Sequence, residues 1–337
     1  MPDKHAILAP SAAHRWLVCT PCAQLEATLP QETSEYAREG TLAHSLCEHK
    51  LRIWLDHEAA YTAYSTTGVP GEMNEMTDRY ADYVIEELIA QRANTPDAKL
   101  LVEVPLDFTG YVPDSFGTSD VVIVSDDTLI VIDFKYGKGV RVDAEGNPQL
   151  RLYALGAYLA LNEIYDFTKV RTVVFQPRLD HIDSEDLTVE SLLLWAREVV
   201  KPRAEMASKG EGPYQPGEHC RFCRAAAVCR ARAEEAFKVV DKASELPPTL
   251  ADEEIAAVLG KLDATEAWIK SIREYALDKA VKEGKHWPGY KLVEARTLRK
   301  IGDQVAALDR LEQAGYDKDD VTNVKLKGLT ELPRLLG

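Results

Sequence analysis

Three short segments rich in Val and Ile lie between stretches of helical periodicity, and this order constrains the fold more than any other feature. The segments are KLLVEVPLDF, GTSDVVIVS and LIVIDFKY, and Asp126-Asp127 predicts a hairpin turn between the last two. Residues 147–163 restore a helical pattern, and VRTVVFQP predicts a fourth strand before the chain turns helical again from about Ser184. The order of helix, three strands, helix and strand predicts an α/β fold.

The C-terminal part of the chain has a different character. Residues 249–283 are helical in pattern, residues 287–300 predict a short β segment, and a last helix is expected to end at Gly315. Two adjacent prolines, Pro247 and Pro248, mark the best candidate for a linker. The two expected domains are therefore a domain closed by a cysteine cluster over 1–246 and an α-rich C-terminal extension over 247–337.

The charge of the chain excludes some functions. With 40 Lys and Arg against 55 Asp and Glu, the formal net charge is −15, so a polyanion such as DNA must be bound by a local basic patch rather than by the whole surface. No apolar run approaches the roughly 18 residues of a membrane span, and the N-terminus lacks a basic-then-apolar signal layout. We therefore expect a cytoplasmic protein that does not contact membranes.

Two aspartates and a lysine form the first candidate site. Asp120 and Asp133 lie in adjacent strands, and a hairpin would place them side by side. Two close carboxylates repel each other unless a hard divalent cation lies between them. Lys135 follows Asp133 by two residues and so shares its face of the strand. The grouping is typical of phosphodiester hydrolysis, although either aspartate alone could simply end a strand.

The spaced strings GTSD, VIDFK and QLRLY resemble the RecB-like branch of the PD-(D/E)xK nuclease superfamily over roughly residues 10–235. That branch has an early helical His, an Asp, a D/E-x-K triplet and a Q-x-x-x-Y on the next helix. The resemblance implies a restriction-endonuclease-like core, in which helices flank a mixed central sheet. The matching positions are His44, Asp120, Asp133, Lys135, Gln149 and Tyr153.

The resemblance also implies a Mg²⁺- or Mn²⁺-dependent deoxyribonuclease. The implied ion ligands are His44, Asp120, Asp133 and the Phe134 carbonyl. Lys135 would orient the attacking water, while Gln149 and Tyr153, four residues apart on a helix, share a face and would contact the DNA strand. Glu103 is either a further carboxylate of the site or a strand residue that faces solvent. A structural histidine and a core tyrosine are the alternatives for His44 and Tyr153.

Six cysteines are too few for a disulfide framework in a chain of this length, but several lie close together. Cys220, Cys223 and Cys229 give C-x2-C-x5-C, which lacks one ligand of a four-coordinate site. Zinc and iron–sulfur clusters both accept four thiolates, so the spacing leaves the choice open. AddB helicase-nuclease subunits and CRISPR-associated exonucleases carry one cysteine before the nuclease core and a similar trio after it. SAAHRWLVCTPC resembles that first segment best at Cys19, with Cys22 as the alternate, which implies a 4Fe-4S cluster, with Zn²⁺ as the alternative.

Basic stretches at 135–151, 217–233 and 284–300 are candidates to line a DNA groove, although solvated surface charge also explains each one. The DNA-binding candidates are Lys138, Arg141 and Arg151. EGTLAH and WPGYKLVEAR also resemble a family of bacteriophage and prophage genomes, which implies DNA replication, recombination or end processing in a bacterial host cell, with phage proteins as partners. The implied activity is that of an exonuclease on single-stranded DNA or duplex ends. The alternatives are a non-catalytic nucleic-acid-binding or replication scaffold that kept the fold, and a zinc-stabilised adaptor.

Overall fold

The computed structural model of the chain describes residues 6–30, 35–57, 69–241, 252–294 and 304–322. The backbone divides into two compact units, Met1–Tyr275 and Ala276–Gly337. The linker expected at Pro247 and Pro248 lies outside the described residues. The described part of the expected β segment, residues 287–294, contains no strand, and the rest of that segment lies outside the described residues.

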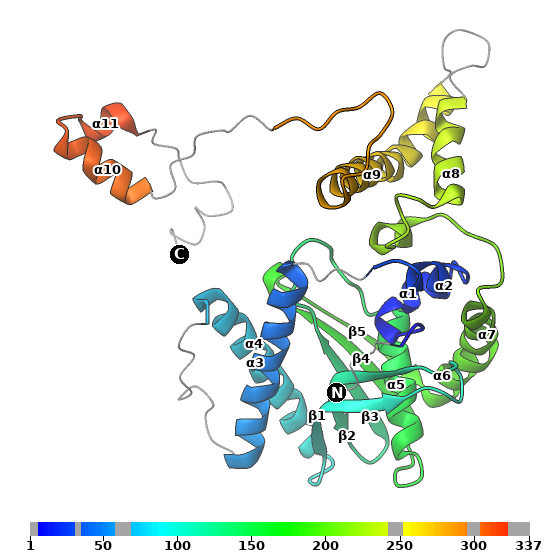
Figure 1. Cartoon of the computed structure of the whole chain (residues 1–337). Coiled ribbons are helices and arrows are strands. Elements are labelled where there is room, and N and C mark those ends of the chain that lie inside the picture. The colour runs from blue at the N-terminus through cyan, green and yellow to red at the C-terminus, as the bar shows by residue number, and fades with distance from the viewer. Residues whose placement is uncertain (1–5, 31–34, 58–68, 242–251, 295–303, 323–337) are drawn as a thin grey trace. The chain divides into compact units, whose positions relative to one another are not determined.

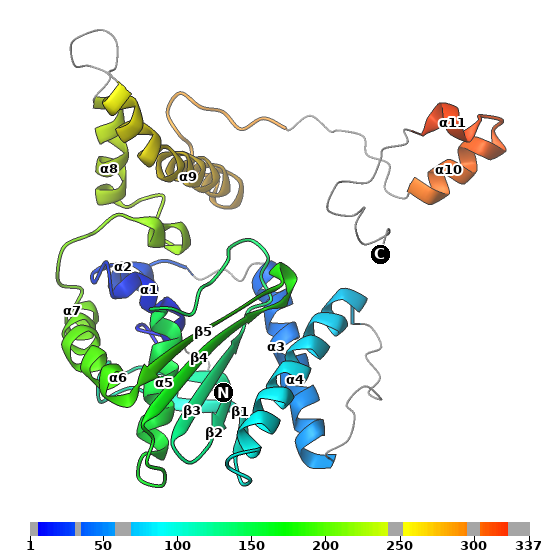
Figure 2. The same ribbon diagram turned by 180° about the vertical axis from the view of Figure 1, so that it is seen from behind.

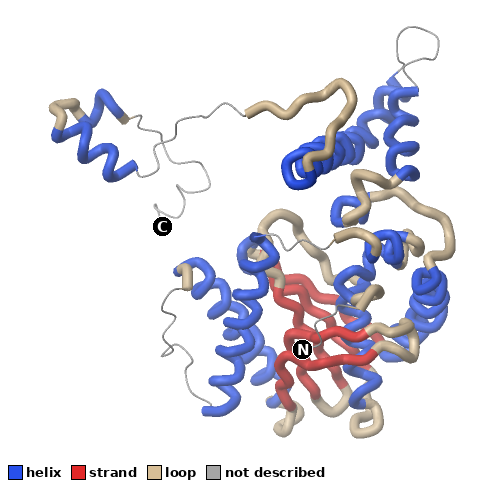
Figure 3. The backbone as a smooth tube through the Cα atoms, viewed as in Figure 1, coloured by secondary structure: helices blue, strands red, loops and turns tan. Residues whose placement is uncertain are grey.

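A five-stranded sheet forms the centre of the first unit (Figure 1, and red in Figure 3). Neighbouring strands follow the chain order, with β3 and β4 parallel and the other pairs antiparallel. The strands are β1 (Lys99–Asp107), β2 (Phe116–Val124), β3 (Thr128–Phe134), β4 (Lys169–Gln176) and β5 (His181–Thr188). The four apolar strands expected from the sequence are present, and the expected turn joins β2 to β3.

Strand β5 corrects the expectation that the chain turns helical from about Ser184. Residues 181–188 pair with β4 as an edge strand, and the next helix begins only at Val189. The half-buried face of β5 carries His181, Asp183 and Glu185, so the strand has no alternation of apolar and polar residues. A period-two hydrophobic signal, by which strands are found in sequences, is therefore missing.

Helices cover both faces of the sheet, as Figure 2 shows from behind. Helices α3 (Glu35–His57) and α4 (Gly71–Arg92) pack on one face against alternate β2 and β3 residues such as Ile123 and Ile132. Helix α5 (Pro148–Leu161) connects β3 to β4 across the other face, against Val122 and Val131. This mixed α/β arrangement confirms the coarse fold class expected from the sequence.

The other helices lie before and after the sheet in the chain. They are α1 (Ala13–Trp16), α2 (Cys22–Ala27), α6 (Val189–Trp195), α7 (Lys201–Lys209), α8 (Arg230–Asp241), α9 (Asp252–Glu283), α10 (Gln304–Gln313) and α11 (Lys318–Val321), with short helical turns η1 (Pro10–Ala12), η3 (Pro177–Leu179), η4 (Ala196–Val200) and η5 (Glu218–Phe222). Helices α1, α2 and α7 complete the layer on the α5 side, where Trp16 is fully buried. None of the described helices combines the length and apolarity that a membrane span requires.

Gly156 allows α5 to approach β1 closely. A Cβ atom at this position would lie 2.5 Å from Phe108 Cε1 and 3.0 Å from Leu106 Cβ, and both side chains are buried. The close approach fixes the distance between α5 and the sheet. It therefore also fixes the distance of Gln149 and Tyr153 from the sheet, because both residues belong to α5.

We expect Gly156→Ala to lower the free energy of unfolding by about 1–3 kcal/mol, because the added methyl group overpacks this contact. Gly260→Ala is the matched control: its Cβ would meet nothing within 4 Å on α9, and alanine is the better helix former by up to about 1 kcal/mol. Urea denaturation of both variants tests the contact. Equal stability of Gly156→Ala and the unchanged chain would contradict it.

Candidate metal centre and thiol pocket

The β2–β3 hairpin brings Asp120 and Asp133 to adjacent positions. The last paired residues of the hairpin are Val121 and Ile132. The next residues on the two strands are Asp120 and Asp133. There the Phe134 N–H donates a 2.8 Å hydrogen bond to Asp120 Oδ2, so a side chain provides the acceptor that the neighbouring backbone would otherwise supply. Asp133 is buried at the end of β3, with 3% of its surface exposed.

His44 and Glu103 complete a compact group with Asp120. His44 Nδ1 of α3 lies 3.0 Å from Asp120 Oδ1. The ligand atoms of His44, Glu103 and Asp120 all lie within 4.8 Å of one another, and we call these residues the metal triad. Burial lowers the pKa of His44, but the carboxylates of Asp120 and Asp133 outweigh it and raise the pKa above its usual value. Burial, followed by the charge of Asp120, raises the pKa of Glu103 to about 7.

The backbone of β1 is strained at Glu103. Its φ of 51° is in the left-handed region, which costs a residue other than glycine roughly 1–2 kcal/mol. Val102 and Val104 pair with Val121 and Ser119 of β2, but the pairing is interrupted at Glu103. Strain of this kind is often held at functional sites. The sequence left Glu103 open between a ligand and a solvent-facing residue, and the structure places it half-buried in the triad.

Lys135 connects Asp133 to helix α5. Lys135 Nζ lies 2.9 Å from Asp133 Oδ2 and donates to Gln149 Oε1 at 3.1 Å. Gln149 Nε2 donates to Asp133 Oδ1 at 3.2 Å and to the Tyr153 hydroxyl at 3.3 Å. Burial raises the pKa of Asp133 although Lys135 opposes it, and burial also raises the pKa of Tyr153. All six residues of the sequence motifs therefore lie in one connected group at the same end of the sheet.

The donor set fits a hard divalent cation. Asp133 Oδ2 is buried, and its partner among the described residues is Lys135 Nζ at 2.9 Å. Buried carboxylate oxygens are normally hydrogen-bonded or bound to a metal. Carboxylate oxygens with one imidazole are ligands that Mg²⁺ and Mn²⁺ accept. The compact triad contains Glu103 in place of the expected Asp133, and Phe134 contacts Asp120 through its N–H.

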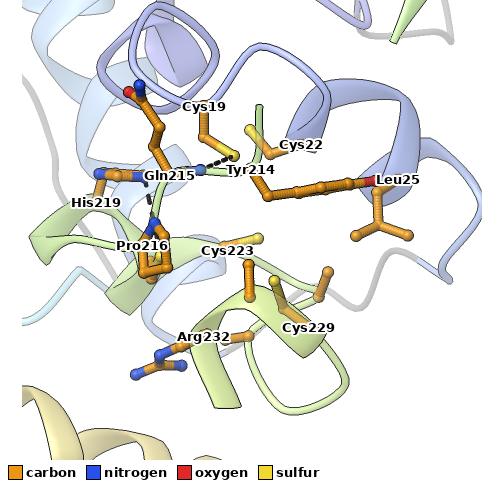
Figure 4. Close-up of a pocket in the computed structure, with 14 residues that line it drawn as sticks. Cys19, Cys22, Leu25, Tyr214, Gln215, Pro216, His219, Cys223, Cys229 and Arg232 are labelled. Atoms are coloured by element: carbon orange, nitrogen blue, oxygen red, sulfur yellow. Dashed lines mark hydrogen bonds between the residues drawn. The ribbon is translucent and has the colours of Figure 1, made fainter. Parts of the chain in front are cut away.

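Five of the six cysteines line one pocket between α2 and the segment after the sheet (Figure 4). We call this pocket, lined by Cys19, Cys22, Cys220, Cys223 and Cys229, the thiol pocket. Both N-terminal candidates, Cys19 and Cys22, reach it. The sixth cysteine, Cys47, is buried between α3 and α4 as expected for a core thiol.

The pocket favours thiolates at two positions. Hydrogen bonds from Cys22 and His219 lower the pKa of Cys19 to about 4, while the same bond raises the pKa of Cys22. Burial opposes ionisation of Cys220, but His219 outweighs it and lowers the pKa of that thiol. His219 was not predicted as a site residue, although its position next to Cys220 in the sequence was a signal.

Hydrogen bonds around the thiol pocket join the N-terminal helices to the chain after the sheet. Thr20 Oγ1 donates to Glu211 O at 2.5 Å, and Gln24 Nε2 donates to Ser208 O at 2.7 Å. The buried Glu26 carboxylate accepts the Arg224 N–H at 2.8 Å and pairs with Arg15 at 3.2 Å. Polar contacts therefore hold the two walls of the pocket together.

The three basic residues expected to bind DNA have different surroundings. Arg151 forms an ion pair with Glu185 of β5 and lies 5.7 Å from the Trp195 ring centre, so its charge is already neutralised. Arg141 pairs with Asp143 at 2.9 Å, with both side chains largely exposed. Lys138 is exposed in the loop between Lys135 and Gln149. The structure thus leaves Lys138 and Arg141 more available to a phosphate than Arg151.

A mixed sheet covered by helices on both faces, with carboxylates, an imidazole and a lysine gathered at one end, defines an α/β protein with a candidate divalent-metal centre. The chain belongs to the family described as "Protein of unknown function (DUF2800)", whose model matches residues 5–337. Among solved structures, the crystal structure of SSO0001 matches 65% of this chain and 96% of its own chain, with 16% identity and a TM-score of 0.26. A likeness this weak supports no conclusion about function.

We expect Mn²⁺ to raise the thermal unfolding midpoint of the protein by several degrees, because an ion at 100 times its dissociation constant stabilises the folded state by about 2.7 kcal/mol. His44→Ala and Asp120→Asn should remove most of this shift, since the first deletes a ligand of the metal triad and the second replaces an anionic ligand with a neutral one. Asp127→Asn, in the exposed β2–β3 turn, is the control. Full Mn²⁺ stabilisation of Asp120→Asn would contradict the ligand assignment.

Proposed function

We propose that this chain is a Mg²⁺- or Mn²⁺-dependent deoxyribonuclease with a RecB-like PD-(D/E)xK core. The observation that carries the proposal is the convergence of six motif residues, described above, from two strands and two helices. Helices α3 and α5 lie on opposite faces of the sheet, so their side chains meet only at its end. A fold without this chemistry has no reason to bury like charges together.

The metal triad and Asp133 would hold the ion. A bound Mg²⁺ or Mn²⁺ would supply Lewis acidity at the scissile phosphate and lower the pKa of water. A bound cation would favour the ionised form of Glu103, against the burial and the neighbouring Asp120 charge that raise its pKa. The backbone strain at Glu103 is consistent with a residue held in place for binding.

Lys135 would act on the water and the phosphate. Its Nζ contacts Asp133 and Gln149 and is partly exposed, so it has donor capacity left for a water or a phosphoryl oxygen. Gln149 is held between Asp133 and Tyr153, which fixes the side of Lys135 that stays open. Charge developing on the phosphate in the transition state would be stabilised by the ammonium group.

DNA is the substrate that we propose, as single strands or duplex ends, with exonuclease action in phage replication, recombination or end processing. The net charge of −15 requires local contacts. Lys138 and Arg141 lie on the loop between Lys135 and Gln149, and both are exposed. Binding through such a small basic patch should depend strongly on salt concentration.

We also propose that the thiol pocket binds a 4Fe-4S cluster. The pocket brings Cys19 together with Cys220, Cys223 and Cys229, which are the early cysteine and the C-x2-C-x5-C trio of the resembling nucleases. Four thiolates are the ligand set of such a cluster, and a zinc ion bound by the same thiols is the alternative.

The nuclease proposal predicts that Asp133→Ala and Lys135→Ala abolish cleavage, at least about a hundredfold, because they remove groups that act on the metal and the water. The assay uses DNA labelled at the 5′ or 3′ end, single- and double-stranded, with Mn²⁺ or with EDTA. Asp127→Ala, exposed in the β2–β3 turn, should cleave as the unchanged chain does.

The same assay separates the alternatives. Unchanged turnover of Lys135→Ala would contradict the site assignment. DNA binding without cleavage under any divalent metal would favour a scaffold that kept the fold. Resistance of the unchanged chain to EDTA would contradict metal dependence.

The cluster proposal predicts that protein purified without oxygen is brown and contains iron and sulfide. Cys223→Ala and Cys19→Ser should lose the colour and part of the stability, while Cys22→Ser should keep both, because four thiolates remain. Iron analysis and visible absorbance measure this outcome. One equivalent of zinc without iron would instead favour the zinc-stabilised adaptor, and colour loss in Cys22→Ser alone would make Cys22 the ligand.

A further inference from the structure

One face of strand β5 is directed at the loop that connects Lys135 to Gln149. The side chains of His181, Asp183 and Glu185 alternate along the half-buried face of the strand, and we call these three residues the inner row. The intervening residues, including Asp186, form the exposed face. Because a strand alternates its side chains, the inner row presents two carboxylates and an imidazole to the same neighbour.

The inner row contacts the backbone of the loop at three successive points. His181 Nε2 lies 3.0 Å from Val142 O. Asp183 Oδ2 accepts the Ala144 N–H at 2.7 Å, and Glu185 Oε1 accepts the Gly146 N–H at 3.0 Å. Hydrogen bonds from backbone N–H groups to carboxylates are stronger than hydrogen bonds between two neutral groups. The loop is therefore attached to the strand at every second residue.

Residues of strand β4 and helix α5 also contact this loop. Gln176 of β4 donates to Gly137 O at 3.0 Å and to Val140 O at 2.8 Å, and it accepts the Val142 N–H at 3.1 Å. Ala144 is fully buried in a small apolar cluster with Leu150 and Val174. The loop thus has a defined path despite three glycines in its sequence.

The last of these contacts lie next to Gln149 in the chain. Gly146, held by Glu185, has a left-handed backbone with φ of 67°. The next residue, Asn147, is the N-cap of α5, and its side chain accepts the N–H groups of Gln149 and Leu150 at 3.0 and 3.4 Å. Glu185 also pairs with Arg151 on the first turn of α5. Two contacts from one carboxylate therefore fix the start of the helix on both sides of Gln149.

We infer that the inner row consists of positioning residues: Asp183 and Glu185 hold the loop and the first turn of α5 so that Gln149 stays between Asp133 and Lys135. The inference rests on the proposed function for its catalytic consequence. His181, Asp143 and Asp183 also have ligand atoms within 4.8 Å of one another, but the loop backbone already occupies His181 and Asp183. Their contacts therefore favour a structural role over a second cation site.

The experiment compares Asp183→Ala with Asp186→Ala. Asp186 lies on the exposed face of the same strand and pairs with Arg171 at 2.7 Å. In Asp183→Ala, we expect exchange of the Ala144 and Gly146 amide hydrogens to rise about tenfold, and turnover with Mn²⁺ to fall about tenfold with little change in KM. Mn²⁺ affinity should not change. Asp186→Ala should match the unchanged chain in all three measurements.

Conservative variants separate the effect of the lost hydrogen bond from the effect of the lost charge. They also keep the test valid if Asp183→Ala misfolds. Asp183→Asn keeps an oxygen that can accept the Ala144 N–H, so it should restore most of the amide protection and turnover. Glu185→Gln should behave in the same way for Gly146.

Three results would overturn the inference. These are unchanged loop exchange in Asp183→Ala, faster exchange without a loss of turnover, and a loss of Mn²⁺ binding, which would make the inner row part of a metal site. If the unchanged chain cleaves no DNA with any metal, the proposed function fails. Hydrogen exchange then still decides whether the inner row holds the loop.

Discussion

The hydrogen bond from the Phe134 N–H to Asp120 Oδ2 determines where the two strand carboxylates meet, and the surrounding centre depends on it. It keeps Asp120 beside Asp133 at the point where backbone pairing between β2 and β3 ends. Negative charges held so close would separate if the strands were free to do so. Close packing of the surrounding elements, including the approach of α5 to β1 at Gly156, opposes the separation.

The candidate centre and the thiol pocket are built from different kinds of interaction. The centre collects charged groups on rigid strands and helices, where burial perturbs the pKa values of Glu103 and Asp133. The thiol pocket lies where two distant chain segments meet, and polar contacts such as Thr20 to Glu211 already join them. A group bound by the thiols would therefore strengthen an existing junction, whereas an ion at the centre would relieve repulsion.

The four apolar strands and helix α5 could be predicted because each has its own periodicity. The candidate site followed from the same register, since a hairpin places Asp120 beside Asp133 and a strand aligns Lys135 with it. The features that could not be predicted are those whose contacts join residues far apart in the sequence. Strand β5 lacks the hydrophobic alternation of a strand because the three residues of its inner row are polar. Their hydrogen-bond partners lie in a loop about forty residues earlier in the chain. The pairing of Arg151 with Glu185 was missed for that reason.

The long separation between the two halves of the thiol pocket has a consequence for biosynthesis. Cys229 follows Cys19 by 210 positions in the sequence, a stretch that takes a ribosome roughly 10–40 s to translate. The main-chain partners of Thr20 and Gln24, at Glu211 and Ser208, are made late as well. During this interval the N-terminal helices have been synthesised without the segment that contributes Cys220, Cys223 and Cys229 to the pocket. A group bound by thiols of both segments would therefore enter the pocket only after the entire sheet had been synthesised.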